Sequence, residues 1–400
     1  MASALTHLEC PECGSRYDAR AQQNVCACGS PLLARYDLDH VRSSVDPEAL
    51  MSREQTLWRY SELLPVDDVD DAATLGEATT PLLRTRRLGA LLDIDDLRIK
   101  DEGRLPTGSF KARGAAIGVS RARELGVRHV AMPTNGNAGA AWAAYAARAG
   151  IAITVVVPRR APEIPTREMT AHGAETYVVD GLIGDAGREV ASMIGRHGWF
   201  DASTLREPYR LEGKKTIGLE VVEQLGWSVP DVVVVPTGGG VGIIGIAKAI
   251  EELDALGWIE SRWPRLVAAQ SSGCAPIVRA WQRGESTVEP WEDASTVAFG
   301  ITVPKPLGGR LVLSALRRSA GTAIAVDDSD ALDELDLVAR SEGIFVCPEG
   351  AVALAAARRL RRDGWIRPRE RVVVINTGAG TLYPDCVRTR PRELGEGGAT

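Results

Sequence analysis

The sequence lacks the features that mark several classes of protein. It has seven cysteines in 400 residues, too few for a disulfide-stapled scaffold. No apolar run approaches the length that spans a bilayer, and the N-terminus has no basic region followed by a long apolar one. A net charge of −6 leaves little long-range attraction for nucleic acid or an anionic membrane. We therefore expect a cytoplasmic protein that acts on small molecules and binds neither nucleic acid nor membrane.

The composition is that of an ordinary globular protein, with 44% apolar and 25% charged residues. A chain of 400 residues exceeds the usual size of a single-core domain, so we predict two or three structural units. We find no internal repeat, and we expect the polar tail at 391–400 to be frayed.

Four of the seven cysteines lie within the first thirty residues, as two tight turns: Cys10 with Cys13, and Cys26 with Cys28. Two such turns can converge on one tetrahedral zinc ion, and a flap without a core of its own gains folding energy from the metal. We therefore predict a zinc-ribbon-like flap over residues 1–40. Reduced thiols in a ribbon that has lost its metal, or a redox pair, are the alternatives.

From about residue 80 onward, short β-branched runs alternate with stretches of helical periodicity, which is typical of an α/β protein with a mostly parallel sheet. The clearest strands are predicted at 130–133, 153–158, 176–179, 232–236, 266–270 and 372–376. Helices are predicted at 112–125, 138–149, 185–196, 216–225 and 242–256. Several of these strands end in Gly, Asn or Thr, and ligands of open α/β sheets bind at the carboxyl ends of strands.

The first chemistry-bearing cluster places Lys111 at the start of the helix predicted at 112–125. The partial positive charge of a helix N-terminus disfavours an ammonium group and would lower the lysine pKa toward that of a nucleophilic amine. The ordinary interpretation of a lone lysine in such a loop is a solvated surface charge. The surrounding segment, Pro-Thr-Gly-Ser-Phe-Lys-Ala-Arg-Gly, favours the interpretation of Lys111 as a catalytic lysine.

A second cluster follows the strand at 130–133 and opens the helix at 138–149. Its small residues expose successive backbone amides that suit a carboxylate, and an Asn side chain there can donate to a phenolate oxygen. The candidate ligands in this loop are Thr134, Asn135, Gly136, Asn137 and Ala138. An ordinary strand-to-helix turn would use the same residue types for conformational reasons.

A third cluster runs from a buried strand into a glycine-rich loop and then a helix, the arrangement that cradles a phosphate. Its residues are Thr237, Gly238, Gly239, Gly240, Val241 and Gly242. With Gly245, the loop also satisfies the letters of a dinucleotide fingerprint. That motif requires an acidic residue at the end of the next strand, where this chain has Gln270, so the phosphate interpretation is favoured.

A fourth cluster ends the strand at 372–376 with Thr377 between small residues. A neutral hydroxyl there could hydrogen-bond to a pyridine nitrogen and leave it largely unprotonated. A common Thr-Gly turn is the alternative.

Taken in order, the four clusters resemble those of the fold-type II (tryptophan synthase β family) pyridoxal-phosphate enzymes, and the similarity spans nearly the whole chain after residue 75. The resemblance implies two open, mostly parallel twisted sheets flanked by helices. It implies that Lys111 holds pyridoxal 5'-phosphate, that Asn137 meets the ring oxygen, that the loop at 237–242 binds the phosphate and that Thr377 meets the ring nitrogen. It further implies a large domain from 41–132 and 206–390, a small mobile domain at 133–205, and a homodimer.

Within that family the chain is most similar to the threonine synthases, through the cysteine flap, the lysine segment, the segments at 207–216 and 343–351, and the threonine at 377. This implies a lyase that converts O-phosphohomoserine and water to threonine and phosphate. Cations available for a substrate phosphate are Arg104, Arg113, Arg160, Lys214, Lys215 and Lys305.

The sequence also departs from the threonine synthases. Ala112 stands where an Asp is common, Thr134-Asn135 stands where Ser-Ala or Ser-Ser is usual, and the phosphate loop is all-glycine as in dehydratases. A threonine or serine dehydratase, or a β-replacement enzyme, is therefore the alternative within the family. Outside it, the alternatives are a nicotinamide-dependent oxidoreductase using residues 240–245 and a non-catalytic binding module using the flap.

Overall fold

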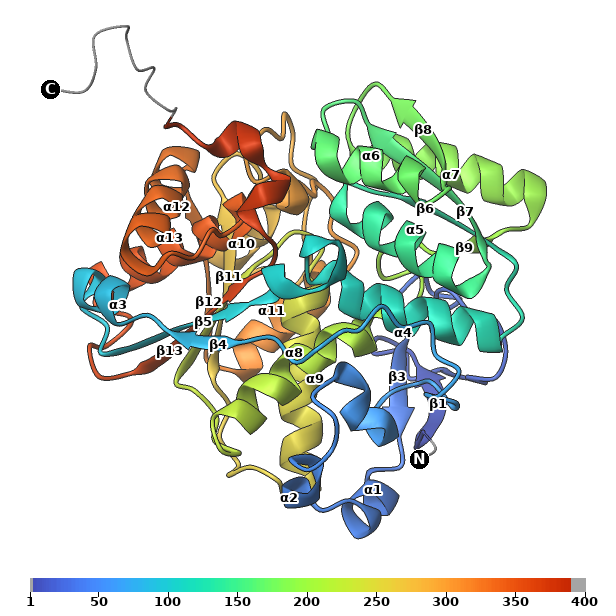
Figure 1. The fold of residues 1–400 in the computed structure, drawn as a ribbon, viewed down its shortest axis with the longest axis horizontal. Helices are drawn as coiled ribbons and strands as arrows, with labels where there is room; N and C mark the ends of the chain where they lie inside the picture. The colour runs from blue at the N-terminus through green and yellow to red at the C-terminus, as the bar shows by residue number, and fades with distance from the viewer. Residues whose placement is uncertain (1–2, 390–400) are drawn as a thin grey trace, which may run out of the picture.

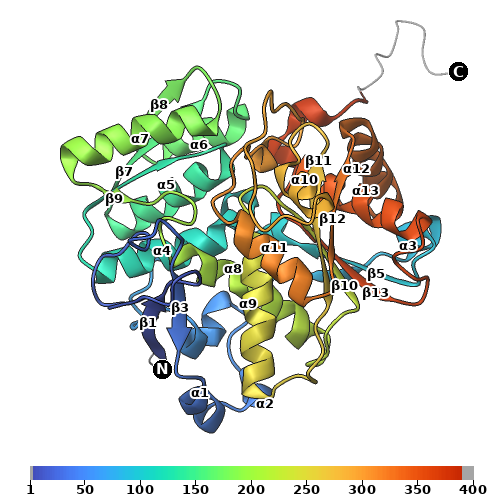
Figure 2. The same ribbon diagram turned by 180° about the vertical axis from the view of Figure 1, so that it is seen from behind.

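The computed structural model describes residues 3–389 and contains three β-sheets (Figure 1). The predicted tail at 391–400 lies outside the described residues. A large sheet and a medium sheet lie side by side, each with helices packed against it, and a small sheet near the N-terminus lies beside the helices between them (Figures 1 and 2).

The large sheet has six strands in the order β12-β11-β10-β13-β5-β4. Neighbouring strands are parallel except for the edge pair β4 and β5, which is antiparallel. The strands are β4 (Leu82–Arg84), β5 (Asp96–Asp101), β10 (Val232–Pro236), β11 (Arg265–Ser271), β12 (Thr322–Val326) and β13 (Arg371–Asn376).

Both faces of this sheet are covered by helices, which explains the continuous valine runs of its central strands. In β10, Val232 and Val234 face one core while Val233 and Val235 face the other. The first core is completed by α3 (Arg86–Leu92), α12 (Asp328–Glu342) and α13 (Pro348–Arg362). The second is completed by α8 (Arg210–Gln224), α9 (Val241–Leu256), α10 (Pro276–Gln282) and α11 (Gly309–Arg318).

The medium sheet has four parallel strands in the order β8-β7-β6-β9. They are β6 (His129–Pro133), β7 (Ala152–Pro158), β8 (Glu175–Val179) and β9 (Phe200–Asp201). One core beside it contains residues of α4 (Lys111–Glu124), α5 (Asn137–Ala149) and α6 (Glu163–Ala171), and a smaller core contains residues of α7 (Ile183–His197).

The N-terminal sheet is antiparallel and has the order β2-β1-β3, with β1 (Leu5–Glu9), β2 (Arg16–Tyr17) and β3 (Leu33–Tyr36). Two short helices follow it, α1 (Leu38–Ser44) and α2 (Pro47–Leu50). The predicted cysteine turns lie in its loops, and β1 contributes the buried Leu8 to the same core as α4.

The fold class predicted from the sequence is confirmed, and each of the six predicted strands is present. The helix predicted at 216–225 was wrong at its start, because α8 already begins at Arg210. Polar residues in its first turns are buried in ion pairs: the Nζ atom of Lys215 lies 2.7 Å from Glu212 Oε2 and 2.8 Å from Glu252 Oε2 of α9. The division into a large and a small mobile domain stays a prediction.

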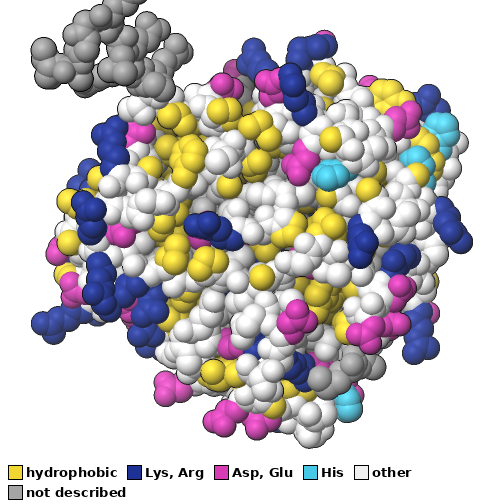
Figure 3. Space-filling view, in the orientation of Figure 1, with side chains coloured by type: hydrophobic (Ala, Val, Ile, Leu, Met, Phe, Trp, Pro, Cys, Tyr) yellow, Lys and Arg dark blue, Asp and Glu magenta, His cyan; other side chains and the backbone are white. Residues whose placement is uncertain are grey.

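None of the helices within residues 3–389 is long and apolar enough to cross a membrane. On the face of the molecule in Figure 3, basic and acidic side chains are interspersed, and among the described residues drawn there the basic ones do not merge into one continuous surface.

Candidate active site

A cavity opens where β6, β10 and β13 end and the two larger sheets approach each other. All four sequence-predicted clusters contribute to its wall. The lining residues include Lys111 from the first cluster, Thr134, Asn135, Asn137 and Ala138 from the second, the whole of 237–242 from the third, and Thr377 from the fourth. Of the residues predicted to bind the cofactor or the amino-acid carboxylate, Gly136 alone is absent from this lining among the described residues.

Lys111 is the first residue of α4, one position earlier than predicted. Its ammonium group lies over the ring of Phe110, 4.3 Å from the centroid. Burial lowers the pKa of Lys111 to about 8, Glu349 opposes this shift, and Arg210 adds to it. A lysine with this pKa has about a tenth of its amine in the neutral, nucleophilic form at pH 7, far more than an ordinary lysine.

The glycine-rich loop joins β10 to the N-terminus of α9, so several unpaired amides of the first helical turn lie at the cavity. Gly240 adopts a φ of +93°, a left-handed conformation that side chains other than glycine rarely adopt. A Cβ atom added at Gly239 would make only an ordinary contact, 3.6 Å from a methyl group of Thr204, so the loop leaves open space beside it. This cradle suits an anionic group larger than a water molecule.

The loop at 134–138 is held by the hydroxyl of Thr134, which accepts from the amides of Gly136 at 3.0 Å and Gly139 at 2.9 Å. The side-chain amide of Asn135 donates to the carbonyl of Thr302 at 2.9 Å. Asn135 therefore fixes the opposite wall of the cavity and its amide nitrogen is already engaged.

Asn137 begins α5, where a loop position was predicted. Its Nδ2 atom donates to the hydroxyl of Tyr383 at 2.8 Å, while its buried Oδ1 atom has no hydrogen-bond partner within residues 3–389. Because the two ends of an amide are interchangeable and a tyrosine hydroxyl both donates and accepts, Asn137 can present either end to a ligand. One polar group of Asn137 is thus left for a ligand.

Thr377 follows β13 and is 5% exposed. Its hydroxyl lies 3.5 Å from the sulfur of Cys347, and its carbonyl accepts from the amide of Phe110 at 3.0 Å. The second contact ties the end of β13 directly to the segment that carries Lys111.

Sequence reasoning missed Glu349, which is 3% exposed and lines the cavity. Its Oε1 atom accepts from the amide of Gly300 at 2.7 Å, whereas its Oε2 atom is buried without a hydrogen-bond partner in the part of the chain that the structure describes. The available signal was its place in Pro-Glu-Gly at a helix start, a position that favours an acidic residue in any protein.

A smaller recess adjoins Lys111 and is also lined by Thr204, Arg210 and Lys214. Sequence reasoning missed Thr204 and Arg210 and named Lys214. Arg210 donates to the hydroxyl of Thr204 at 3.0 Å, and Lys214 donates to the carbonyl of Phe110. Burial, with further repulsion from Lys111, lowers the pKa of Lys214 well below its usual value.

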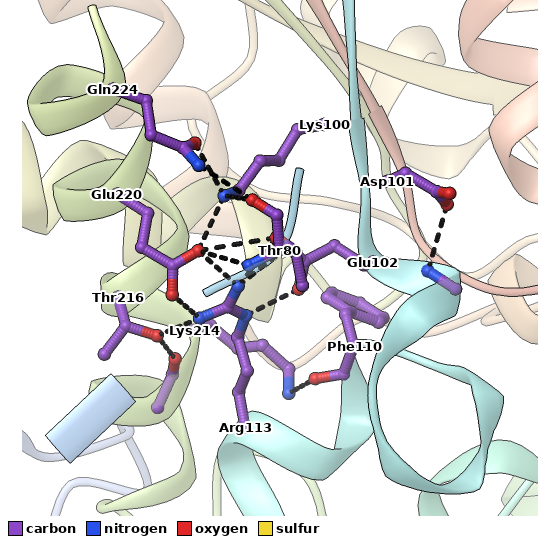
Figure 4. Close-up of polar contacts among 12 residues, drawn as sticks. Thr80, Lys100, Asp101, Glu102, Phe110, Arg113, Lys214, Thr216, Glu220 and Gln224 are labelled. Atoms are coloured by element: carbon purple, nitrogen blue, oxygen red, sulfur yellow. Dashed lines mark hydrogen bonds and ion pairs between the residues drawn. The ribbon is translucent and has the colours of Figure 1, made fainter. Parts of the chain in front are cut away.

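Two of the other cations suggested for a substrate phosphate are engaged elsewhere. Arg113 is buried between Glu102 and Glu220 (Figure 4), and Lys215 is buried between Glu212 and Glu252. Arg104, Arg160 and Lys305 are not among the residues that line the cavity or the recess. Of the six predicted cations, Lys214 alone lines the recess. Arg210, which was not predicted, lines it as well.

The sulfur atoms of Cys10, Cys13, Cys26 and Cys28 all lie within 4.8 Å of one another. Cys10 and Cys28 are 3.6 Å apart, and Cys13 and Cys26 are 3.5 Å apart. Four thiolates around a tetrahedral zinc with bonds of about 2.3 Å are about 3.8 Å apart. The donor set and its spacing fit such an ion.

Comparison with known proteins identifies the family. The family described as pyridoxal-phosphate dependent enzyme matches residues 73–378. The chain belongs to the pyridoxal-phosphate dependent enzymes. It is 37% identical over 377 residues to a threonine synthase of Methanocaldococcus jannaschii, covering 94% of this chain and 93% of the relative. It is also 37% identical over 376 residues to a threonine synthase of Methanosarcina acetivorans, covering 94% of this chain and 91% of the relative.

Solved structures of the same family share the fold. Maize serine racemase superposes with a TM-score of 0.65 at 25% identity, covering 77% of this chain and 91% of the racemase. Because the family match covers residues 73–378, the protein is a pyridoxal-phosphate dependent enzyme. The nicotinamide-dependent oxidoreductase and the non-catalytic binding module are excluded. The cavity fits the cofactor of the family, because it combines a lysine of lowered pKa, an open glycine cradle and the unpartnered Oδ1 atom of Asn137.

Proposed function

We propose that this enzyme is a threonine synthase, which converts O-phosphohomoserine and water to threonine and phosphate. The similarity to threonine synthases over 94% of the chain supports the proposal. The observation that carries it is the recess beside Lys111, which is lined by two basic side chains: Arg210, which also pairs with Glu207, and Lys214, whose buried amine would be held as ammonium by a bound phosphate. A dianionic phosphate is the substrate group that such a pair of cations suits.

We assign the cofactor to the four clusters in the cavity. Lys111 would hold the cofactor covalently, the loop at 237–242 would bind its phosphate, Asn137 would bind the ring oxygen and Thr377 the ring nitrogen. The loop from Thr134 to Ala138 would bind the carboxylate of the amino acid through its backbone amides. These assignments are supported because all of the named residues except Gly136 line one cavity.

When bound, the cofactor draws electron density away from the substrate carbons and so makes their protons acidic. Lys111 is the residue placed to move those protons, because burial lowers its pKa to about 8 and so brings its amine and ammonium forms within reach of each other near neutral pH. Arg210 and Lys214 would hold the phosphate as it departs from the γ carbon, and water would add at the β carbon.

We further propose that the cysteine flap binds one structural zinc ion through Cys10, Cys13, Cys26 and Cys28. The spacing of the four sulfur atoms supports this assignment. Protein purified without chelator should contain about one zinc per chain by elemental analysis, and a Cys13→Ser variant should contain far less. A zinc content well below one equivalent in the unaltered protein would contradict the assignment.

We also propose that the enzyme is a cytoplasmic homodimer and that residues 133–205 form a small domain that closes over the substrate. Light scattering of the purified protein should give twice the chain mass of 42.8 kDa. Small-angle scattering with and without a non-reactive phosphonate analogue of the substrate should show compaction if the small domain closes. A monomer, or an unchanged scattering profile, would contradict these proposals.

One assay separates threonine synthase from the dehydratase or β-replacement alternative. The holoenzyme should release phosphate and threonine in equal amounts from O-phosphohomoserine. Formation of a 2-oxo acid and ammonia from threonine or serine, without phosphate release from O-phosphohomoserine, would establish the dehydratase and contradict our proposal. The all-glycine stretch at 238–240 is the sequence feature that favours the dehydratase alternative.

A further inference from the structure

The cysteine flap rests on the segment that forms one wall of the recess beside Lys111. In Figure 2 the dark-blue flap lies beside β9 and α4. Asn24, between the two cysteine turns, donates through Nδ2 to the carbonyl of Asp201 at 2.8 Å and to the carbonyl of Arg206 at 3.2 Å. One flap side chain thus joins the two ends of residues 201–206.

The conformation of residues 201–206 decides where Thr204 lies. Thr204 lines both the cavity and the recess, and its hydroxyl accepts from Arg210. The next residue, Leu205, has a φ of +62°, a left-handed conformation that costs free energy for a non-glycine residue. Such a conformation persists only where surrounding contacts hold it, and the bridge made by Asn24 is one of these contacts.

Other flap contacts reach different parts of the enzyme. Gln22 donates through its side-chain amide to the carbonyl of Leu125 at 3.1 Å, at the end of α4. The carbonyl of Ala19 accepts from the hydroxyl of Tyr209 at 3.0 Å and from Arg121 at 2.9 Å. Two flap side chains at 18–24 donate hydrogen bonds to the rest of the described chain, and of these only Asn24 reaches residues 201–206.

We propose that Asn24 is a positioning residue for substrate binding: by bridging the carbonyls of Asp201 and Arg206 it fixes Thr204 and, through Thr204, the guanidinium of Arg210. This proposal rests on the function proposed above, because it assigns the recess to the phosphate of the substrate. It gives the flap a role in the active site although no flap residue lines the cavity or recess among the described residues.

The test compares Asn24→Ala with Gln22→Ala in the holoenzyme. Both variants remove one side-chain amide that reaches from the flap to a carbonyl outside it, but the hydrogen bond of Gln22 goes to Leu125 and not to residues 201–206. Asn24→Ala should raise KM for O-phosphohomoserine about tenfold with kcat changed less than about twofold, and Gln22→Ala should leave both near their original values. The absorbance of the bound cofactor should be unchanged in both variants.

A second measurement does not depend on the substrate. Hydrogen exchange of peptides covering 201–210 should be faster in Asn24→Ala than in the unaltered protein, and unchanged in Gln22→Ala. Equal exchange in all three proteins would overturn the proposal, and so would faster exchange with an unchanged KM. If the unaltered enzyme does not convert O-phosphohomoserine, the proposed function fails, and the exchange comparison still decides whether Asn24 holds the segment.

Discussion

Two buried polar regions lie within one chain and differ in how completely their hydrogen bonds are satisfied. The first is the ion network between α4, α8 and β5 (Figure 4). Arg113 donates to Glu102 at 2.6 Å and to Glu220 at 2.8 Å, and Lys100 donates to Glu220 at 2.6 Å. Although burial alone would raise it, Arg113 and Lys100 hold the pKa of Glu220 well below its usual value.

The second region is the cavity, where Asn137 and Glu349 each keep one buried oxygen without a hydrogen-bond partner among the described residues. A buried polar atom without a protein partner costs free energy, which an ordered water or a ligand recovers. The satisfied network therefore contributes to the fold, whereas the two unpartnered oxygens, because Asn137 and Glu349 line the cavity, are left for a ligand. Substitutions in the two regions should therefore affect different quantities.

The largest effect is expected at Lys111. Lys111→Ala should reduce turnover by at least about 10³-fold, because it removes both the covalent attachment and the proton-transfer group. The protein should stay folded, since the substitution removes a buried ammonium rather than a packed hydrophobic group. Turnover and mass spectrometry of the borohydride-reduced protein measure these outcomes.

Lys305→Ala is the matched control, because Lys305 is exposed and lies outside the cavity lining. It should retain activity and its cofactor adduct at a single lysine. Appreciable turnover by Lys111→Ala, or an adduct mapped to another lysine, would refute the assignment.

The next effect in size belongs to the ion network. Arg113→Met should lower the free energy of unfolding by about 3–5 kcal/mol, because it leaves the buried carboxylates of Glu102 and Glu220 without their guanidinium partner. Chemical denaturation of the cofactor-free protein measures this loss. Arg167→Met, which breaks an exposed pair with Glu163, should cost less than about 1 kcal/mol. Equal losses in the two variants would show that the network is not structural.

Most of the cavity residues could be predicted from the sequence. Asn137, the loop at 237–242 and Thr377 each follow the end of a strand, and Lys111 begins a helix. Hydrophobic periodicity reveals such positions. The ordered set of local motifs was sufficient to place them in one cavity. The strands that carry them were predicted from β-branched runs that the structure buries on both faces.

The residues that escaped prediction act through contacts that are distant in sequence. Glu349 reaches the cavity because α13 packs beside β13, and Arg210 reaches Lys111 because α8 packs against α4. Arg113 and Lys214 are both basic residues near a motif, and sequence cannot tell that the first is neutralised by Glu102 and Glu220 while the second faces the recess. Such pairings depend on tertiary packing.

A smaller and sharper test exchanges a hydroxyl for a methyl group in each region. Thr377→Val should weaken cofactor binding about tenfold, the worth of about one hydrogen bond, and should change the stability of the cofactor-free protein by less than about 1 kcal/mol. Thr216→Val should do the opposite, because the hydroxyl of Thr216 accepts from Arg113 at 2.8 Å within the ion network. It should cost about 1–3 kcal/mol of stability and leave cofactor affinity near its original value. Cofactor titration and chemical denaturation measure these effects. If both variants changed cofactor affinity and stability alike, the cavity and the ion network would not differ in the way proposed.

The smallest expected effect is a shift in pH dependence. Because burial lowers the pKa of Lys111 to about 8, covalent capture of the cofactor by the cofactor-free enzyme should accelerate as pH rises through about 8 and level off above it. Glu349 opposes the lowering by stabilising the ammonium form, so Glu349→Gln should move the midpoint to lower pH. Stopped-flow absorbance between pH 6 and pH 10 would follow the capture step, with Glu370→Gln as a control carboxylate outside the cavity lining. A midpoint that stays in place in Glu349→Gln would mean that the carboxylate of Glu349 does not change the pKa of Lys111. The unpartnered oxygen of Glu349 would then act only by binding the ligand.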